Sequence, residues 1–228
     1  MLKLHGFSAS NYYNVAKLAL LEKGLAFEEV LVYTGAGEKY RPDYLDMSPL
    51  GKVPCLETDE GFLTESRCIV DYLERAHPRP ALYPEGAFAR AKLLELTQII
   101  DLYLELPARR VLPNFITRTP PGDAVAAEVR DVVSKGCGAL SKLASFDRFL
   151  LGDQFTAADV SAVLHFPIVR MLTTQVLDCD PLTGVAGLEG YLARLEERPT
   201  VRKVRADQEA AFPGFIAHVR EHYGISAG

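Results

Sequence analysis

A proline-rich stretch divides the chain into two parts with different patterns. Short strands and helices alternate before it, whereas every periodic segment after it is helical. The stretch from His77 to Gly86 holds three prolines and little periodicity, which is typical of a segment between domains. A chain of 228 residues is long enough for two small domains. We therefore predict a first domain of residues 1–77, a linker of residues 78–87 and a second domain of residues 88–228.

The first part reads strand, helix, strand, connection, strand, strand, helix. Period-two alternation and β-branched or aromatic residues indicate the strands. Ser10 and Asn11 are good N-caps for the first helix, and Gly24 marks its end. The last helix opens at Ser66 and stops before Pro78. The expected strands are 2–5, 26–33, 53–58 and 62–64, with helices at 15–21 and 66–76 and one helical turn near Tyr44.

The second part is predicted to be helical throughout. Thr156 and Asp159 have the spacing of a capping box, so Asp159 is interpreted as a cap and not as a catalytic acid. Pro107 and Pro167 are expected to disturb the helices that contain them. The fold class is therefore α+β with two domains: a four-stranded mixed sheet flanked by helices, then an all-helical domain. The expected helices are 88–112, 124–146, 156–172, 188–197 and 200–210.

Composition argues against several classes of function. The formal net charge is -5 and the chain has no basic run, so no nucleic-acid or anionic-membrane partner is expected. No apolar stretch approaches the roughly 20 residues that cross a bilayer, and residues 1–7 are too short and polar for a secretory signal. The four cysteines form no CxxC pair and no zinc-like cluster, which suits a reducing compartment. We predict a cytoplasmic protein without a metal site.

Several segments resemble cytosolic glutathione transferases. Residues 48–56, 63–67 and 69–74 are similar to the family's glutathione-binding domain, and residues 155–159 match the capping segment of its helical domain. Order and spacing agree over nearly the whole chain. The resemblance implies a thioredoxin-like first domain, a helical-bundle second domain and pairing of subunits as homodimers. It also implies that glutathione is the co-substrate, with no further cofactor.

The resemblance assigns the peptide backbone of glutathione to Val53 and Pro54. In this fold the bond between them is cis, and the open strand edge at Val53 pairs antiparallel with the cysteinyl backbone of the tripeptide. A proline that merely ends an edge strand is the alternative.

Charged groups of glutathione are assigned to the next strand-to-helix junction. Ser66 and the first N–H groups of its helix are suited to a carboxylate, and Glu65 to the γ-glutamyl ammonium. Ser66 is alternatively a plain N-cap. Lys52 is the preferred partner of the glycyl carboxylate and Lys39 the second choice, with Arg67 also in the candidate set. Solvated surface charge is the alternative for these cations.

Catalysis in this family consists mainly of stabilising a thiolate. The serine of the theta-, phi- and zeta-like classes falls on Ser10, and the cysteine of the beta and omega classes falls on Tyr12. Thiol exchange with a protein cysteine is therefore disfavoured. Asn11 and Tyr13 remain alternative donors to the sulfur, because a shift of one residue in the loop changes the assignment.

The leading hypothesis is an enzyme that directs the glutathione thiolate at a small hydrophobic electrophile. A glutathione-dependent peroxidase or isomerase uses the same thiolate, and the second substrate decides between these reactions. The rival from another class is a non-catalytic glutathione- or ligand-binding protein on the same fold. The sequence does not identify the electrophile, the pathway or the class within the family.

Overall fold

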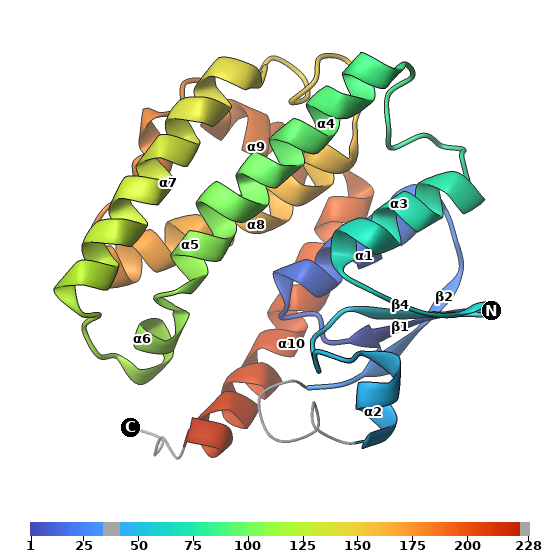
Figure 1. The fold of residues 1–228 in the computed structure, drawn as a ribbon, viewed down its shortest axis with the longest axis horizontal. Helices are drawn as coiled ribbons and strands as arrows, with labels where there is room; N and C mark the ends of the chain where they lie inside the picture. The colour runs from blue at the N-terminus through green and yellow to red at the C-terminus, as the bar shows by residue number, and fades with distance from the viewer. Residues whose placement is uncertain (34–41, 224–228) are drawn as a thin grey trace. The chain divides into compact units, whose positions relative to one another are not determined.

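The computed structural model describes residues 1–33 and 42–223, which form two compact units (Figure 1). One unit contains Met1–Ala81 together with the chain from Arg198 onward, and the other contains Leu82–Glu197. The break after Ala81 falls inside the predicted linker of residues 78–87. The assignment of the C-terminal segment differs from the predicted second domain of residues 88–228, because that segment packs against the first helix of the chain.

The first unit is built on a mixed four-stranded sheet, as predicted. Its strands lie in the order β2-β1-β3-β4; β1 and β2 are parallel, and the other two pairs are antiparallel. The hairpin between β3 and β4 turns at Asp59 and Glu60. The strands are β1 (Leu2–Gly6), β2 (Phe27–Leu31), β3 (Cys55–Thr58) and β4 (Gly61–Thr64).

Three helices accompany this sheet among the described residues of the first part of the chain. Helices α1 (Asn11–Glu22) and α3 (Ser66–Ala76) pack against each other on one side of the sheet, and α2 (Pro42–Met47) lies on the other (Figure 1). Apolar residues on most faces of residues 15–21 predict a helix with little exposed surface, and α1 is indeed buried on nearly its whole circumference.

The second unit consists of helices around α8 (Ala157–Leu177). Thr156 and Asp159 form the predicted capping box at its start. The bend expected near Pro107 takes the form of a π-helical stretch, η2 (Ile100–Glu105), just before that proline. The other elements are α4 (Ala87–Ile99), α5 (Leu106–Arg109), α6 (Leu112–Thr117), α7 (Asp123–Leu143), η3 (Pro181–Gly184) and α9 (Leu188–Glu196).

The expectation that no segment is apolar enough to span a bilayer is wrong for helix α8. It has 21 residues and a window of mean hydropathy 1.3, which meets that criterion by length and composition. Because 61% of this window is buried within the protein, α8 has the character of a core helix.

The last helix, α10 (Pro199–Tyr223), extends to Tyr223, so the predicted end at residue 210 is wrong. Pro213 lies inside it, although proline removes a backbone hydrogen bond. Tertiary contacts support the second half: the ring of Phe215 stacks on Phe7 at 5.2 Å, and that of His218 on Tyr33 at 4.5 Å. Tertiary packing therefore outweighs the tendency of Pro213 to end the helix.

Candidate active site

The register of the sheet gathers the predicted glutathione-binding segments at one end. Cys55 of β3 pairs with His5 of β1 and with Thr64 of β4. Residues 53–54 precede β3, residues 7–10 follow β1, and Glu65 follows β4. Because both pairings are antiparallel, these three segments lie at the same end of the sheet. The candidate site is therefore assembled from positions far apart in the sequence.

Ser10 stands at the start of α1 as its N-cap. Its Oγ accepts a hydrogen bond of 3.3 Å from the Tyr13 backbone N–H, and its side chain is half-buried. A hydroxyl that accepts one hydrogen bond keeps its own proton to donate. No residue in the first turn of α1 is acidic, so no carboxylate there opposes the positive end of the helix dipole. Both features favour an anion next to Ser10.

The Val53–Pro54 peptide is cis, as the resemblance implies. Val53 makes no backbone hydrogen bond to another residue in the described part of the chain. The turn before it is fixed, because the Lys52 carbonyl accepts hydrogen bonds from Tyr44 Oη and Ser48 Oγ, each of 2.8 Å. A fixed backbone edge with unused donor and acceptor groups is suited to pair with an extended peptide.

Glu65 and Ser66 form the start of α3. Glu65 is the N-cap, with φ 63° and ψ 113°, and its side chain makes no capping hydrogen bond. A non-glycine residue at positive φ is costly, and such conformations are concentrated at functional sites. Ser66 is the first helical residue and is buried, so the alternative that Ser66 itself is the N-cap is wrong. The helix start presents backbone N–H groups that the N-cap side chain does not satisfy.

Sequence comparison bears directly on this site. Family profiles described as the N-terminal and C-terminal domains of glutathione S-transferase match residues 4–81 and 100–199. A protein of Pseudomonas putida named glutathione S-transferase is 39% identical over 220 residues, which cover 96% of this chain and 98% of that protein. The chain belongs to the glutathione S-transferase family. It is an enzyme of the glutathione transferase type.

Other relatives of this transferase have isomerase names. Maleylpyruvate isomerase of Ralstonia sp is 29% identical over 201 residues, 86% of this chain and 93% of that protein. A solved structure of maleyl pyruvate isomerase, described as a bacterial transferase of the zeta class, has a TM-score of 0.74 at 28% identity and covers 89% of this chain and 95% of that one. A glutathione transferase of Populus trichocarpa has a TM-score of 0.78 at 22% identity, covering 92% and 100%, and supports the fold.

Tyr13 is buried, and its hydroxyl already donates a hydrogen bond within the fold. Its side chain is 1% exposed, and its Oη donates a hydrogen bond of 2.7 Å to Glu29 Oε2. Burial, and then this carboxylate, raise the pKa of the phenol far above its usual range. The ring packs so closely on Gly6 that a Cβ there would lie 2.4 Å from it. These contacts count against Tyr13 as the thiolate partner.

The remaining candidates have different surroundings. Asn11 is buried in the first turn of α1, Lys52 is exposed beside the Val53 edge, and Arg67 is half-buried in the first turn of α3. Lys39 lies outside the described residues. The roles of these side chains stay predictions.

Sequence reasoning missed Lys17, which is 1% exposed and pairs with both Glu29 and Asp207 at 2.7 Å. The one available signal was a lysine inside an otherwise apolar helix, because a fully buried lysine needs a charged partner. The described residues contain no group of three or more His, Cys, Asp or Glu side chains that could hold a metal ion.

Proposed function

We propose that this transferase binds glutathione at the end of its sheet and that Ser10 stabilises the thiolate. The observation that carries this assignment is Ser10 itself: a half-buried N-cap with a proton still to donate, on a helix without an acid in its first turn. Tyr13, by contrast, is already bonded to Glu29.

The chemistry requires a shift in one proton equilibrium. A free thiol has a pKa near ~8.5, so only a few per cent is ionised at neutral pH. A hydrogen bond to sulfur and the positive end of a helix both favour the thiolate. The thiolate then attacks a small hydrophobic electrophile, forming a carbon–sulfur bond and releasing the leaving group.

The rest of the tripeptide is held by main-chain and charged groups. We assign the cysteinyl backbone to the Val53 edge, the γ-glutamyl ammonium to Glu65 and its carboxylate to Ser66 and the α3 start. Lys52 is assigned to the glycyl carboxylate, with Lys39 and Arg67 as the other candidate cations.

Substitutions at the start of α1 test the catalytic assignment. Ser10→Ala is expected to lower kcat/KM by about a hundredfold while leaving KM for glutathione nearly unchanged, because the lost hydrogen bond is made to the charged sulfur. Tyr13→Phe is expected to keep most of the activity. Steady-state kinetics with a generic electrophile and a spectroscopic titration of the bound thiol measure both effects. An Asn11→Ala enzyme that alone loses the thiolate would overturn the assignment to Ser10.

An isomerase is the second candidate function. It is favoured by the relatives named maleylpyruvate isomerase, and isomerisation uses the same thiolate without consuming glutathione. An assay of maleylpyruvate with catalytic amounts of glutathione separates the two reactions. Turnover beyond the amount of glutathione supplied indicates isomerisation, and stoichiometric consumption indicates conjugation. A chain that binds glutathione without either turnover would be the ligand carrier.

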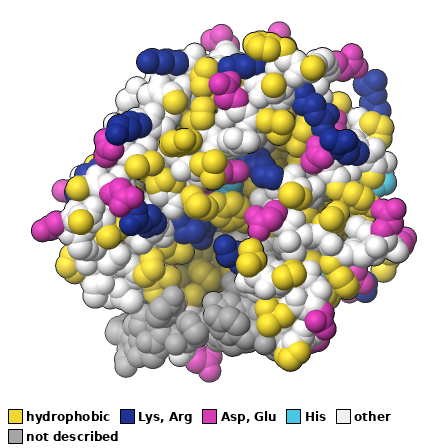
Figure 2. Space-filling view, viewed as in Figure 1, with side chains coloured by type: hydrophobic (Ala, Val, Ile, Leu, Met, Phe, Trp, Pro, Cys, Tyr) yellow, Lys and Arg dark blue, Asp and Glu magenta, His cyan; other side chains and the backbone are white. Residues whose placement is uncertain are grey.

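We further propose a cytoplasmic homodimer that requires glutathione but no other cofactor and binds neither nucleic acid nor membrane. The surface is compatible with this proposal, since acidic and basic side chains are mixed over the visible face (Figure 2). Analytical ultracentrifugation tests the dimer, and activity after exhaustive dialysis with a chelator tests the cofactor requirement.

A further inference from the structure

Lys17 connects three elements of the first unit from a fully buried position. Its Nζ lies 2.7 Å from Glu29 Oε2 on β2 and 2.7 Å from Asp207 Oδ2 on α10. A third contact, of 3.3 Å, goes to Ser8 Oγ. The ammonium group is thus held by two carboxylates and donates to the loop between β1 and α1.

That loop is the segment that presents Ser10. The Asn14 side-chain amide donates a hydrogen bond of 2.8 Å to the Ser8 carbonyl, and the Ser10 N–H donates one of 3.0 Å to the Phe7 carbonyl. Asn14 and Lys17 are three residues apart, so they project from the same side of α1. Helix α1 therefore holds its own leading loop at both the backbone and the side chain of Ser8.

The charges around Lys17 are largely compensated by its neighbours. Glu29 also accepts the Tyr13 hydroxyl, and Asp207 also pairs with Lys203 at 3.0 Å. Burial opposes ionisation of Asp207, but hydrogen bonds from Lys17 and Lys203 outweigh it and lower its pKa. With Lys203 included, the cluster holds two formally positive and two formally negative side chains, so it presents little net charge to a third group. Lys17 therefore affects the site by positioning the groups that it contacts, and not through its own charge.

We propose that Lys17 is a positioning residue of the thiolate site: anchored on Glu29 and Asp207, it holds the Ser8 hydroxyl and so fixes the loop that carries Ser10. This inference rests on the proposed role of Ser10. The ion cluster around Lys17 would then serve catalysis as well as the stability of the fold.

The test compares variants that cut different contacts of the same cluster. Ser8→Ala removes the loop contact and leaves both ion pairs, whereas Lys17→Met removes all three contacts. Each is expected to raise the pKa of bound glutathione by about one unit and to lower kcat/KM at neutral pH by about tenfold, since small displacements of a catalytic group are costly. Lys17→Arg is expected to restore most of the loss, and the double variant to be no worse than Lys17→Met.

Lys203→Met is the matched control. Lys203 pairs with the same Asp207 carboxylate but lies at an exposed position on α10, four residues before it. Its substitution is expected to leave the thiol pKa unchanged. An effect as large as that of Lys17→Met would show that loss of charge balance, and not loop position, is responsible, and would overturn the proposal.

The outcomes separate this inference from the proposed function. If Ser10→Ala raises the thiol pKa and Ser8→Ala does not, the Lys17 proposal fails while the role of Ser10 stands. If neither variant raises it, the proposed thiolate site fails as well. Should Lys17→Met not fold, Ser8→Ala alone decides, because it removes a single hydroxyl from a half-buried loop position.

Discussion

Asp159 shows how a single buried side chain can hold a helix start. Its carboxylate accepts hydrogen bonds from the Leu150 and Thr156 backbone N–H groups and from the hydroxyls of Thr156 and Tyr191, at 2.8–2.9 Å. Burial raises its pKa, while these four hydrogen bonds act in the opposite direction. All acceptor capacity is used within the fold, which confirms the interpretation of Asp159 as a cap.

Glu57 provides a residue-scale prediction about pH. Its carboxylate accepts hydrogen bonds of 2.8 Å from Lys3 and from His5 across the β1–β3 pair, and these hold its pKa below the ordinary 4.5. A depressed folded-state pKa contributes stability that is present above pH 4.5 and lost as the pH falls through the folded value. We therefore expect Glu57→Gln to flatten the acid side of the stability profile.

Urea denaturation at a series of pH values measures this slope. Glu209→Gln serves as the control, because Glu209 is exposed and takes part in no ion pair among the described residues. Equal slopes for the wild type and Glu57→Gln would contradict the prediction.

At the scale of elements, the packing of α7 against η2 depends on one glycine. A Cβ at Gly136 would lie 2.7 Å from both Leu104 Cδ2 and the Tyr103 carbonyl oxygen, and a backbone atom cannot move aside cheaply. Gly136→Ala is therefore expected to destabilise the protein by about 1–3 kcal/mol, despite the better helix propensity of alanine.

Gly138 offers the matched comparison on the same helix. It is exposed, and a Cβ there meets nothing within 4 Å. Gly138→Ala is expected to stabilise the protein by about 0.5–1 kcal/mol through helix propensity alone. Thermal denaturation of the two variants decides the point, and shifts in the same direction would show that the close contact is absent.

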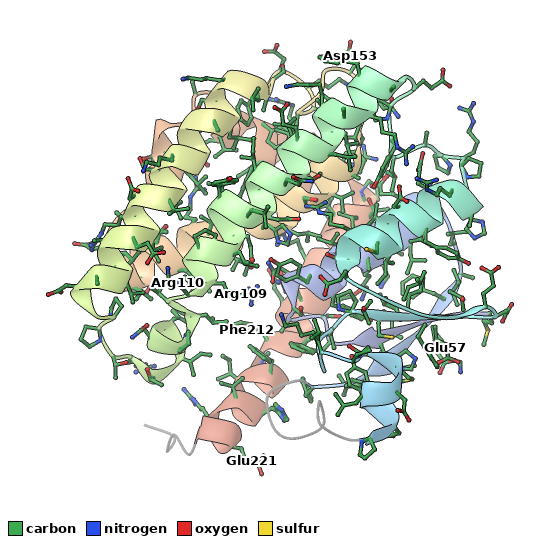
Figure 3. The ribbon with its side chains drawn as sticks, in the orientation of Figure 1. Glu57, Arg109, Arg110, Asp153, Phe212 and Glu221 are labelled. Atoms are coloured by element: carbon green, nitrogen blue, oxygen red, sulfur yellow. The ribbon has the colours of Figure 1, made fainter. Side chains whose placement is uncertain are left out.

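At the scale of the whole molecule, the first unit is completed by the last helix of the chain. Arg198 pairs with Glu22 of α1, Asp207 pairs with Lys17, and aromatic rings of α10 stack on Phe7 and Tyr33. Phe212, labelled in Figure 3, projects from the same helix and lies near Phe215, with ring centroids 6.4 Å apart. The sheet and its flanking helices thus acquire part of their core from residues more than 170 positions away.

Truncation after Glu197 tests this dependence. Removing one partner of a buried ion pair costs about 3–5 kcal/mol, which is a large share of the roughly 5–15 kcal/mol that stabilise a domain. We expect the truncated chain to lose glutathione binding and protease resistance in residues 1–81 while residues 82–197 stay folded. Limited proteolysis with mass spectrometry reads out both parts.

A synthetic peptide of residues 198–223 supplies the control for this truncation. Added to the truncated chain, it is expected to restore protection of residues 1–81, and the same peptide with Asp207→Ala is expected to restore less. Protection of the truncated chain without any peptide would mean that α10 is dispensable.

The sequence alone determined the features that depend on neighbouring residues. The four strands, the buried first helix and the capping box at Asp159 follow from local periodicity and capping chemistry, and the structure confirms them. The segments of the candidate glutathione site were also found by their order along the chain, although their roles stay predictions.

Tertiary structure decided what depends on distant partners. Helix α10 continues through Pro213 because the first unit packs against it, and Tyr13 turns to Glu29 because β2 lies beside α1. Lys17 is buried because residues 29 and 207 supply its counter-charges. No local pattern specifies such contacts, since their free energy is gained only when separate elements of the chain meet.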